Sequence, residues 1–416
     1  MKTRAPATRR VVLTGMGIVS PLGNSKAEVW RALKAGRSGV RVVPEMKELG
    51  YKHPVAGLIR ELVTDAVGKK HLRTMSDPAR YAAVATLEAL QDALLPPERL
   101  RSTRAGVVVG TGGGSADDAS TAETLLLTHK SPARIGAAAI VRIMNSTAAL
   151  NLSAWLGVKG RCYSVSSACT TGTDSIGHGF ELIRHGLLDL CICGGAEGAG
   201  WRHGWAAGDA SGVMPFDLGE HPEQACRPYD RDRQGMVPSE GAGIVLLESL
   251  EHAEQRGATV VAEVIGYGSA NDGESMFEPK GTGLTRAIEQ ALRLASELHG
   301  TVTIDYINPH GAGTRVGDPV EIQVIRQVFG EPSPLVSSTK PLNGHSQGAA
   351  GAHEAIFTLL MLQHDFVIAT ANLDNVAPEC EGVRHVRSPL AQPLKTVMTF
   401  NSGLGGTNAC LIFRKP

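Results

Sequence analysis

Arg10-Val11-Val12-Leu13-Thr14-Gly15-Met16-Gly17, near the start of the chain, is echoed by Ala262-Glu263-Val264-Ile265-Gly266-Tyr267-Gly268 in its second part. In both segments apolar residues lead into two closely spaced glycines, which predicts a buried strand that other backbone approaches closely. The echo indicates that one α/β unit occurs twice. We therefore expect two similar halves, residues 1–256 and 257–416, packed tightly because no low-complexity linker separates them.

The rest of the chain favours the same fold class, α/β with mostly buried sheets. Short apolar runs alternate with helical patterns throughout. Val107-Val108-Val109 predicts a buried strand, and Asp77 to Leu95 predicts a helix that Asp77 caps. With 416 residues, 42% of them hydrophobic and 20% charged, the chain is long enough for two domains of ordinary globular composition.

Charge and cysteine content argue against several classes of function. Lys and Arg number 41, as do Asp and Glu, so the chain has no overall attraction to nucleic acid or to a membrane surface. The seven cysteines lack zinc-type spacing, which predicts no metal and a reducing, cytoplasmic location. The apolar run Val11 to Val19 has no signal-peptide pattern and is expected to form a first strand. No apolar run is long enough to cross a bilayer.

Cys169 lies in Tyr163-Ser164-Val165-Ser166-Ser167-Ala168-Cys169-Thr170-Thr171-Gly172, between a predicted strand and a helical face formed by Ile176, Phe180 and Ile183. A thiol at such a turn meets the positive end of the helix dipole. The dipole is expected to lower the thiol pKa and to aim backbone N–H groups at a carbonyl under attack. A small buried cysteine without chemistry fits the same context equally well.

Two polar segments carry histidines. His310 lies in a glycine-rich loop, Asn308-Pro309-His310-Gly311-Ala312-Gly313-Thr314, after a predicted strand, where α/β proteins collect their sites. The alternative is a loop histidine that satisfies backbone groups. Glu321 follows Asp318 at the start of a predicted helix, where a capping box explains it without chemistry.

Lys340 and His345 precede a run of small residues and an apolar helix that ends near Leu362. A helix N-terminus lowers the pKa of His345 and favours a neutral imidazole that can donate an N–H to a developing oxyanion. The apolar helix predicts a buried setting for Lys340. The chain ends in a strand followed by Phe400 to Asn408, whose glycines either bring backbone donors to a ligand or form a tight β turn.

Together these motifs, in this order, resemble the condensing enzymes of fatty acid and polyketide synthesis, and type I β-ketoacyl-acyl-carrier-protein synthases most. The resemblance covers essentially the whole chain. It implies a thiolase-like five-layered αβαβα fold with two duplicated halves, usually as a homodimer, and chemistry without a metal or an organic cofactor. The matching motifs are Arg73 to Asp77, Ser166 to Cys169, Cys226 to Asp230, His310 to Asp318, Thr339 to Gly351 and Gly405 to Asn408.

The resemblance also implies roles for individual residues. Cys169 would take the acyl group, and the backbone N–H groups of Cys169 and Leu404 would form the oxyanion hole. His310 and His345 would stabilise the enolate that forms when a malonyl group loses carbon dioxide. Lys340 would orient the histidines, with Glu321 as its ion-pair partner.

A partner protein follows from the same resemblance. The substrates would be attached to an acyl carrier protein, whose pantetheine arm would bind at Thr314. Lys70 and Arg73 match docking positions for this acidic partner, although a solvated basic surface explains them equally well.

The chain departs from the family at two places. Ala312 replaces a threonine that would bind the pantetheine arm. Ser402 and Leu404 stand where the family has two phenylalanines, the first of them a gate beside the nucleophile. We expect a wider pocket mouth, or one filled by Phe400, and a substrate other than a plain saturated acyl chain.

Two alternatives remain at this point. A thiolase would need a second catalytic cysteine near the C-terminus, where Cys410 follows Thr-Asn-Ala on an apolar strand. A chain-length-factor-like partner subunit would lack the nucleophile. The presence of Cys169 together with both histidines argues against this second alternative.

Overall fold

The computed structural model describes residues 8–200, 204–214 and 221–416. Within these residues the largest sheet has eleven strands, in the order β12-β10-β9-β14-β15-β8-β1-β7-β6-β4-β5. Its two central strands are β1 (Val11–Val19) and β8 (Ala262–Asn271), which pair antiparallel near their starts. The prediction of a first strand over Val11 to Val19 is confirmed. The two segments that echo each other in sequence lie side by side in the middle of the sheet.

Strand order repeats on the two sides of this centre. Outward from β1 come β7, β6, β4 and β5, and outward from β8 come β15, β14, β9 and β10. On both sides the first two pairings are antiparallel and the next two are parallel. We propose residues 256 and 257 as the limit between the halves, since they lie between α10 and β8. The strands are β4 (Ala105–Gly110), β5 (Cys162–Tyr163), β6 (Leu190–Glu197), β7 (Gly241–Ser249), β9 (Tyr306–Asn308), β10 (Leu335–Val336), β12 (Arg384–His385), β14 (Thr396–Gly403) and β15 (Thr407–Arg414).

Helices cover both outer faces and fill the space between the halves, which gives the thiolase-like layered arrangement. Helix α4 packs on β1 and β7, and α11 packs on β8 and β15. Between the halves, α8 and α14 pack against each other and against strands of both halves. These helices and their companions are α4 (Asp77–Asp92), α7 (Thr147–Leu156), α8 (Thr171–Arg184), α10 (Leu250–Gln255), α11 (Thr282–His299), α12 (Gly317–Phe329) and α14 (Ala350–His364).

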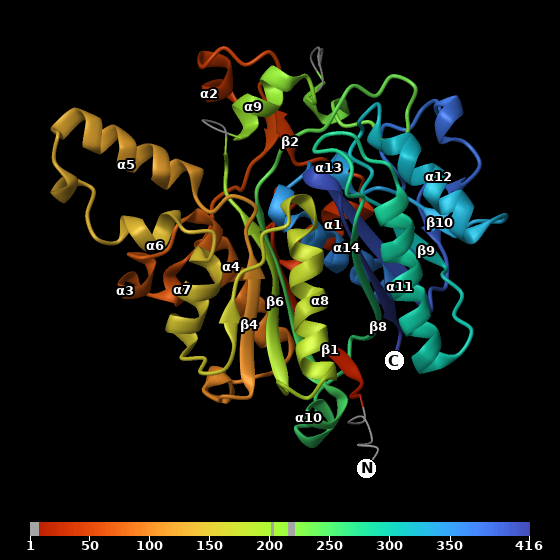
Figure 1. Ribbon diagram of the computed structural model, residues 1–416, viewed down its shortest axis with the longest axis horizontal. Helices are drawn as coiled ribbons and strands as arrows, with labels where there is room; N and C mark the ends of the chain where they lie inside the picture. The colour runs from red at the N-terminus through yellow and green to blue at the C-terminus, as the bar shows by residue number, and fades with distance from the viewer. Residues whose placement is uncertain (1–7, 201–203, 215–220) are drawn as a thin grey trace.

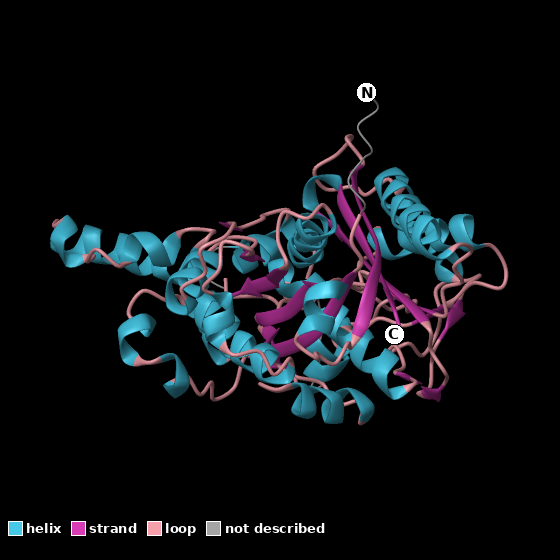
Figure 2. Ribbon diagram, turned by 90° about the horizontal axis from the view of Figure 1, so that it is seen from below, coloured by secondary structure: helices cyan, strands magenta, loops and turns pink. Residues whose placement is uncertain are grey.

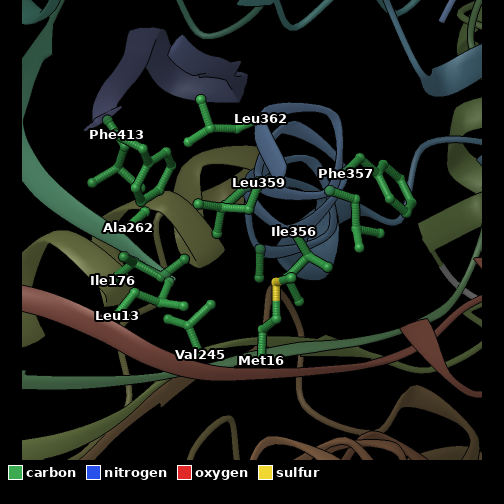
Figure 3. Packing of buried hydrophobic residues seen from close by; sticks show 14 of the residues in the cluster. Leu13, Met16, Ile176, Val245, Ala262, Ile356, Phe357, Leu359, Leu362 and Phe413 are labelled. Carbon is green, nitrogen blue, oxygen red and sulfur yellow. The ribbon is translucent and has the colours of Figure 1, made fainter. Parts of the chain in front are cut away.

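Of the two central helices, α14 is buried on every side, whereas α8 exposes Glu181 near its end. All residues of α14 from Ala350 to Leu362 are buried, as expected of a helix that is apolar all round. In Figure 3, Ile356 of α14 lies in the same cluster as Met16 of β1 and Ile176 of α8. Close approach of α8 to α14 requires glycine, because a Cβ at Gly172 would lie 2.5 Å from the backbone nitrogen of Ala352.

An arm projects from the first half, formed by α5 (Ala116–His129) and α6 (Ala139–Ile143) (Figures 1 and 2). Among the described residues no helix combines the length and the apolar character needed to span a membrane. Helix α4 begins at Asp77 as predicted, but its N-cap is Ser76, and Asp77 instead pairs with Arg80. Further elements are α1 (Lys26–Lys34), β2 (Val40–Val42), α2 (Pro44–Glu48), β3 (Val55–Gly57), α3 (Lys69–Leu72), α9 (Gly204–Ser211), α13 (Lys340–Asn343), β11 (Phe366–Val367) and β13 (Leu390–Ala391).

Candidate active site

Cys169 lies in a single 3-10 turn, Ala168–Thr170, that leads directly into α8. Ala168 has a positive φ of 54°, a conformation that costs a non-glycine residue about 1–2 kcal/mol and needs support from its surroundings. Hydrogen bonds supply this support: the N–H of Ser167 donates to the Thr171 hydroxyl at 2.9 Å, and the Ser167 hydroxyl donates to Asp174 at 2.6 Å. The strand-to-helix setting predicted for the thiol is confirmed.

The predicted lowering of the thiol pKa is wrong. Burial raises the pKa of Cys169 to about 11, against the opposing effects of Lys340 and of a hydrogen bond from the backbone N–H of Leu404. The helix dipole was expected to dominate, but removing the sulfur from water weighs more. The same contact places the N–H of Leu404 where the resemblance put an oxyanion donor.

His345 is the imidazole nearest to the thiol, with its Nε2 3.1 Å from the Cys169 sulfur. The backbone N–H of Gln347 donates to Nδ1 of His345 at 3.3 Å, so a neutral ring carries its proton on Nε2. Burial and the nearby Lys340 hold the pKa of His345 well below its usual range. The neutral imidazole predicted for His345 therefore agrees with the structure, but the causes are burial and Lys340 and not the helix N-terminus.

His310 stands edge-on to His345, with ring centroids 5.0 Å apart. Burial, Lys340 and His345 all lower its pKa. The side-chain amide of Asn401 lies 3.4 Å from Nδ1 of His310 and donates to Glu354 at 2.6 Å. Both rings are therefore neutral donors that face one space beside the thiol.

Lys340 is buried, as predicted, but its ion-pair partner is Glu354 and not Glu321. Its ammonium group also donates to the backbone carbonyl of His310. Glu354 lies on α14 and contacts the ammonium group of Lys340. Glu354 belongs to none of the motifs quoted above, but the sequence carries a usable signal for it, because it is the only Asp, Glu, Lys or Arg in that helix.

Glu321 supports the His310 loop from its other side. Its Oε1 accepts from the backbone N–H of Gly311 and from the hydroxyl of Tyr229, both at 2.8 Å. Asp318 accepts from the N–H groups of Gly313 and Thr314 at 3.1 Å each. The capping box is also wrong, because both carboxylates are occupied by this loop. Burial raises the pKa of Glu321 to about 8.

A small cavity of about 30 Å³ adjoins His310. Thr314 and Ser402 line it, whereas Phe400 is fully buried in the core of the second half, opposite Cys410. The alternative in which Phe400 fills the pocket is therefore wrong, because its side chain points into the core. The Ser402 hydroxyl donates to Asn408 at 2.7 Å. The other lining residues are Pro279, Gly281, Leu284, Gly317, Asp318, Val320, Glu321 and Asn408.

The remaining candidates lie away from this centre. Cys410 is buried in strand β15. Lys70 and Arg73 are exposed at and just after α3. The Leu404 side chain is 58% exposed, so only its backbone faces the thiol. In the described part of the chain no group of three His, Cys, Asp or Glu residues has the geometry of a metal site.

Comparisons with known proteins agree with this geometry. Curated 3-oxoacyl-(acyl-carrier-protein) synthase 1 of Haemophilus influenzae is 42% identical, over 98% of this chain and 99% of that protein. The ishigamide ketosynthase/chain length factor structure matches with a TM-score of 0.90 and 31% identity, over 99% of this chain and 100% of that one.

A further solved structure contains a carrier protein. The AntDE:AntF structure, a type II polyketide acyl-carrier protein in complex with its ketosynthase, matches with a TM-score of 0.88 and 30% identity, over 98% of this chain and 100% of that one. Family profiles match twice: "Beta-ketoacyl synthase, N-terminal domain" covers residues 8–253, and "Beta-ketoacyl synthase, C-terminal domain" covers residues 261–374. The chain belongs to the β-ketoacyl synthase family.

Proposed function

We propose that the protein is a 3-oxoacyl-acyl-carrier-protein synthase, which extends an acyl thioester with a malonyl unit. The observation that carries this proposal is the arrangement of three side chains, those of Cys169, His345 and His310, beside the N-terminus of α8. The Cys169 sulfur lies 3.1 Å from the Nε2 of His345, and the His310 ring completes the site beside them. A nucleophile beside two neutral N–H donors fits acyl transfer followed by enolate stabilisation.

In the first step the Cys169 sulfur attacks the acyl thioester carbonyl. The N–H groups of Cys169 and Leu404 hold the resulting oxyanion, and the pantetheine thiolate of the carrier leaves. The Nε2–H of His345 and the N-terminal end of α8 favour the thiolate in this step, which offsets part of the burial that raises the thiol pKa.

In the second step a malonyl thioester occupies the space beside the acylated cysteine. Its thioester oxygen accepts from His310 and His345, so that loss of carbon dioxide leaves an enolate held by two neutral donors. The enolate carbon attacks the acyl carbonyl on Cys169, and the sulfur leaves. Lys340 fixes the His310 loop through its carbonyl and supplies positive charge behind both rings.

The two rival functions have less support. A thiolase would need a second cysteine at the site, and Cys410 instead lies in the apolar core with its thiol pKa raised by burial. A chain-length-factor-like subunit would need no nucleophile, whereas Cys169 and His345 are in contact.

Acyl carrier protein is the proposed partner, docking near Lys70 and Arg73. A second copy of the chain is the proposed neighbour of the α5–α6 arm, because apolar side chains along the arm and at the adjoining helix are exposed and a homodimer would cover them. We place the protein in the cytoplasm, where its free cysteines remain reduced. The exposed apolar residues are Leu126 and Leu127 of α5, Ile140 of α6, Met144 just after α6, and Leu150 of the adjoining α7.

The pathway is either fatty acid synthesis or a specialised polyketide-type pathway. Ser402 lines the pocket beside His310, and this favours an acyl substrate unlike a plain saturated chain. The family phenylalanine at this position would fill much of that space.

The test uses the purified chain with acyl-carrier and malonyl-carrier substrates. We expect a 3-oxoacyl product, and an acyl adduct on Cys169 found by mass spectrometry. Cys169→Ala should form neither. An adduct on Cys162 or Cys410, or condensation by Cys169→Ala, would contradict the proposal.

A further inference from the structure

Glu197 is a buried acid that the mechanism above does not use. It is the last residue of β6, and only 4% of its surface is exposed. Its Oε2 accepts from two backbone N–H groups, those of Gly112 and Gly348, both at 2.9 Å. One carboxylate oxygen thus joins the loop after β4, in the first half, to the turn before α14, in the second.

The two residues that bind this carboxylate must be glycine. A Cβ at Gly112 would lie 2.5 Å from Oε2 of Glu197, and a Cβ at Gly348 would lie 2.7 Å from it. Any larger residue at either position would displace the carboxylate from the amides it binds. The contact therefore depends on the length of the Glu197 side chain and on two bare backbone segments.

The turn that Glu197 holds is the one that orients His345. Gly348 directly follows Gln347, a non-glycine residue with a positive φ of 47°. The N–H of Gln347 donates to Nδ1 of His345 and thereby leaves the proton on the Nε2 that faces Cys169. A strained turn keeps its shape only when its surroundings determine it, and the bond from Gly348 to Glu197 is one such constraint.

We propose that Glu197 is a positioning residue, whose carboxyl oxygen clamps the Gln347–Gly348 turn so that His345 presents its Nε2–H to Cys169. This inference rests on the proposed role of His345. Acceptance of hydrogen bonds is the property that holds the turn, whereas the negative charge of Glu197 acts separately, by raising the pKa of Cys169. Burial raises the pKa of Glu197 to about 7 while the amides oppose the rise, and both protonation states keep an oxygen acceptor.

This distinction reverses the usual order of conservative variants. Glu197→Gln removes the charge but keeps an acceptor oxygen at the same distance. Glu197→Asp keeps the charge but is one methylene too short to reach both amides. We expect Glu197→Gln to keep kcat for malonyl decarboxylation within about threefold of wild type. Glu197→Asp should lose about fivefold to a hundredfold, because one unmet buried amide disfavours the turn that orients His345 by that factor. The KM for malonyl carrier should change little in both.

A control separates positioning from general loosening. Leu152→Ala in α7 removes buried apolar volume away from the site. It should lower the thermal midpoint at least as much as Glu197→Asp does, and it should keep decarboxylation. If Glu197→Asp does not fold, Glu197→Met replaces it, because Met fills the volume without any acceptor.

Equal activity of the Asp and Gln variants, or a Gln variant worse than Asp, would overturn the inference. His345→Ala, assayed in parallel, identifies which idea has failed. If His345→Ala still decarboxylates malonyl carrier, the proposed function is at fault. If His345→Ala is inactive, but Glu197→Asp (or Glu197→Met in its place) is as active as Glu197→Gln, then only the positioning role of Glu197 is refuted.

Discussion

Replacing Lys340 with Met tests the ion pair that sequence analysis assigned to the wrong carboxylate. Lys340 is buried, pairs with the equally buried Glu354 and donates to the carbonyl of His310. Methionine fills a similar volume but leaves Glu354 without a cation. Removing one member of a buried pair costs about 3–5 kcal/mol of unfolding free energy, because the remaining charge is uncompensated.

The loss should depend on pH in a definite direction. Burial already raises the pKa of Glu354, and Lys340 is the largest opposing influence, so the pKa rises further in Lys340→Met. A carboxyl group with a folded-state pKa above its unfolded value stabilises the protein fully at low pH, and this contribution is lost as pH rises toward the folded-state pKa. As the pH rises above the ordinary carboxyl range, the variant should therefore lose more stability than wild type, at up to about 1.36 kcal/mol per pH unit until the folded-state pKa of Glu354 is reached.

Urea unfolding of two double variants provides the assay. Lys340→Met with Glu354→Gln should recover most of the lost stability at about pH 7.5, because the unpaired buried charge is gone. Lys340→Met with Glu321→Gln should recover none, since Glu321 binds Gly311 and Tyr229 instead. Two results would refute the reasoning. One is recovery of stability when Lys340→Met is combined with Glu321→Gln but not with Glu354→Gln. The other is a Lys340→Met variant that is more stable at high pH than at low pH.

Three further predictions concern catalysis and binding. His310→Ala and His345→Ala should each lose condensation by at least about a hundredfold while acyl loading survives, and normal malonyl decarboxylation in both would remove their proposed role. Charge reversal at Lys70 and Arg73 should raise the KM for carrier substrates in a salt-sensitive way, and an unchanged KM at low salt would exclude docking there. Ser402→Phe should narrow the range of acyl chains accepted in a substrate panel; if the native enzyme prefers straight saturated chains and the substitution leaves that profile unchanged, Ser402 carries no specificity.

The secondary-structure elements around Cys169 could be predicted from the sequence, because they depend on residues that are close together in the chain. The strand, turn and helix around Cys169 follow from apolar spacing and glycine placement. The raised thiol pKa could not be predicted, because it depends on how deeply the folded chain buries the sulfur. The direction predicted for the pKa of His345 was right, but its causes are burial and the Lys340 cation, both of which disfavour the charged imidazolium.

The errors concern residues whose partners lie far along the chain or on another helix. Glu321 was paired with Lys340 because both match family motifs, but the fold places Glu354 of α14 against the ammonium group. Phe400 lies two residues from Ser402 in the sequence, but its strand turns that side chain into the core and not into the pocket. Glu197 gave no signal, since its partners are backbone amides of glycines that only the folded chain brings together.

The duplication explains why the site forms where the halves meet. In the first half, Ala168 has a φ of 54° in a 3-10 turn that leads into buried α8; in the second, Gln347 has a φ of 47° in a 3-10 turn that leads into buried α14. The two turns are counterparts, so Gly348 takes the place of Cys169. One half thus supplies the thiol, and the other supplies the imidazole that precedes its own copy of the turn. Since the 3.1 Å contact of Cys169 with His345 joins the two copies, neither half alone can form the site.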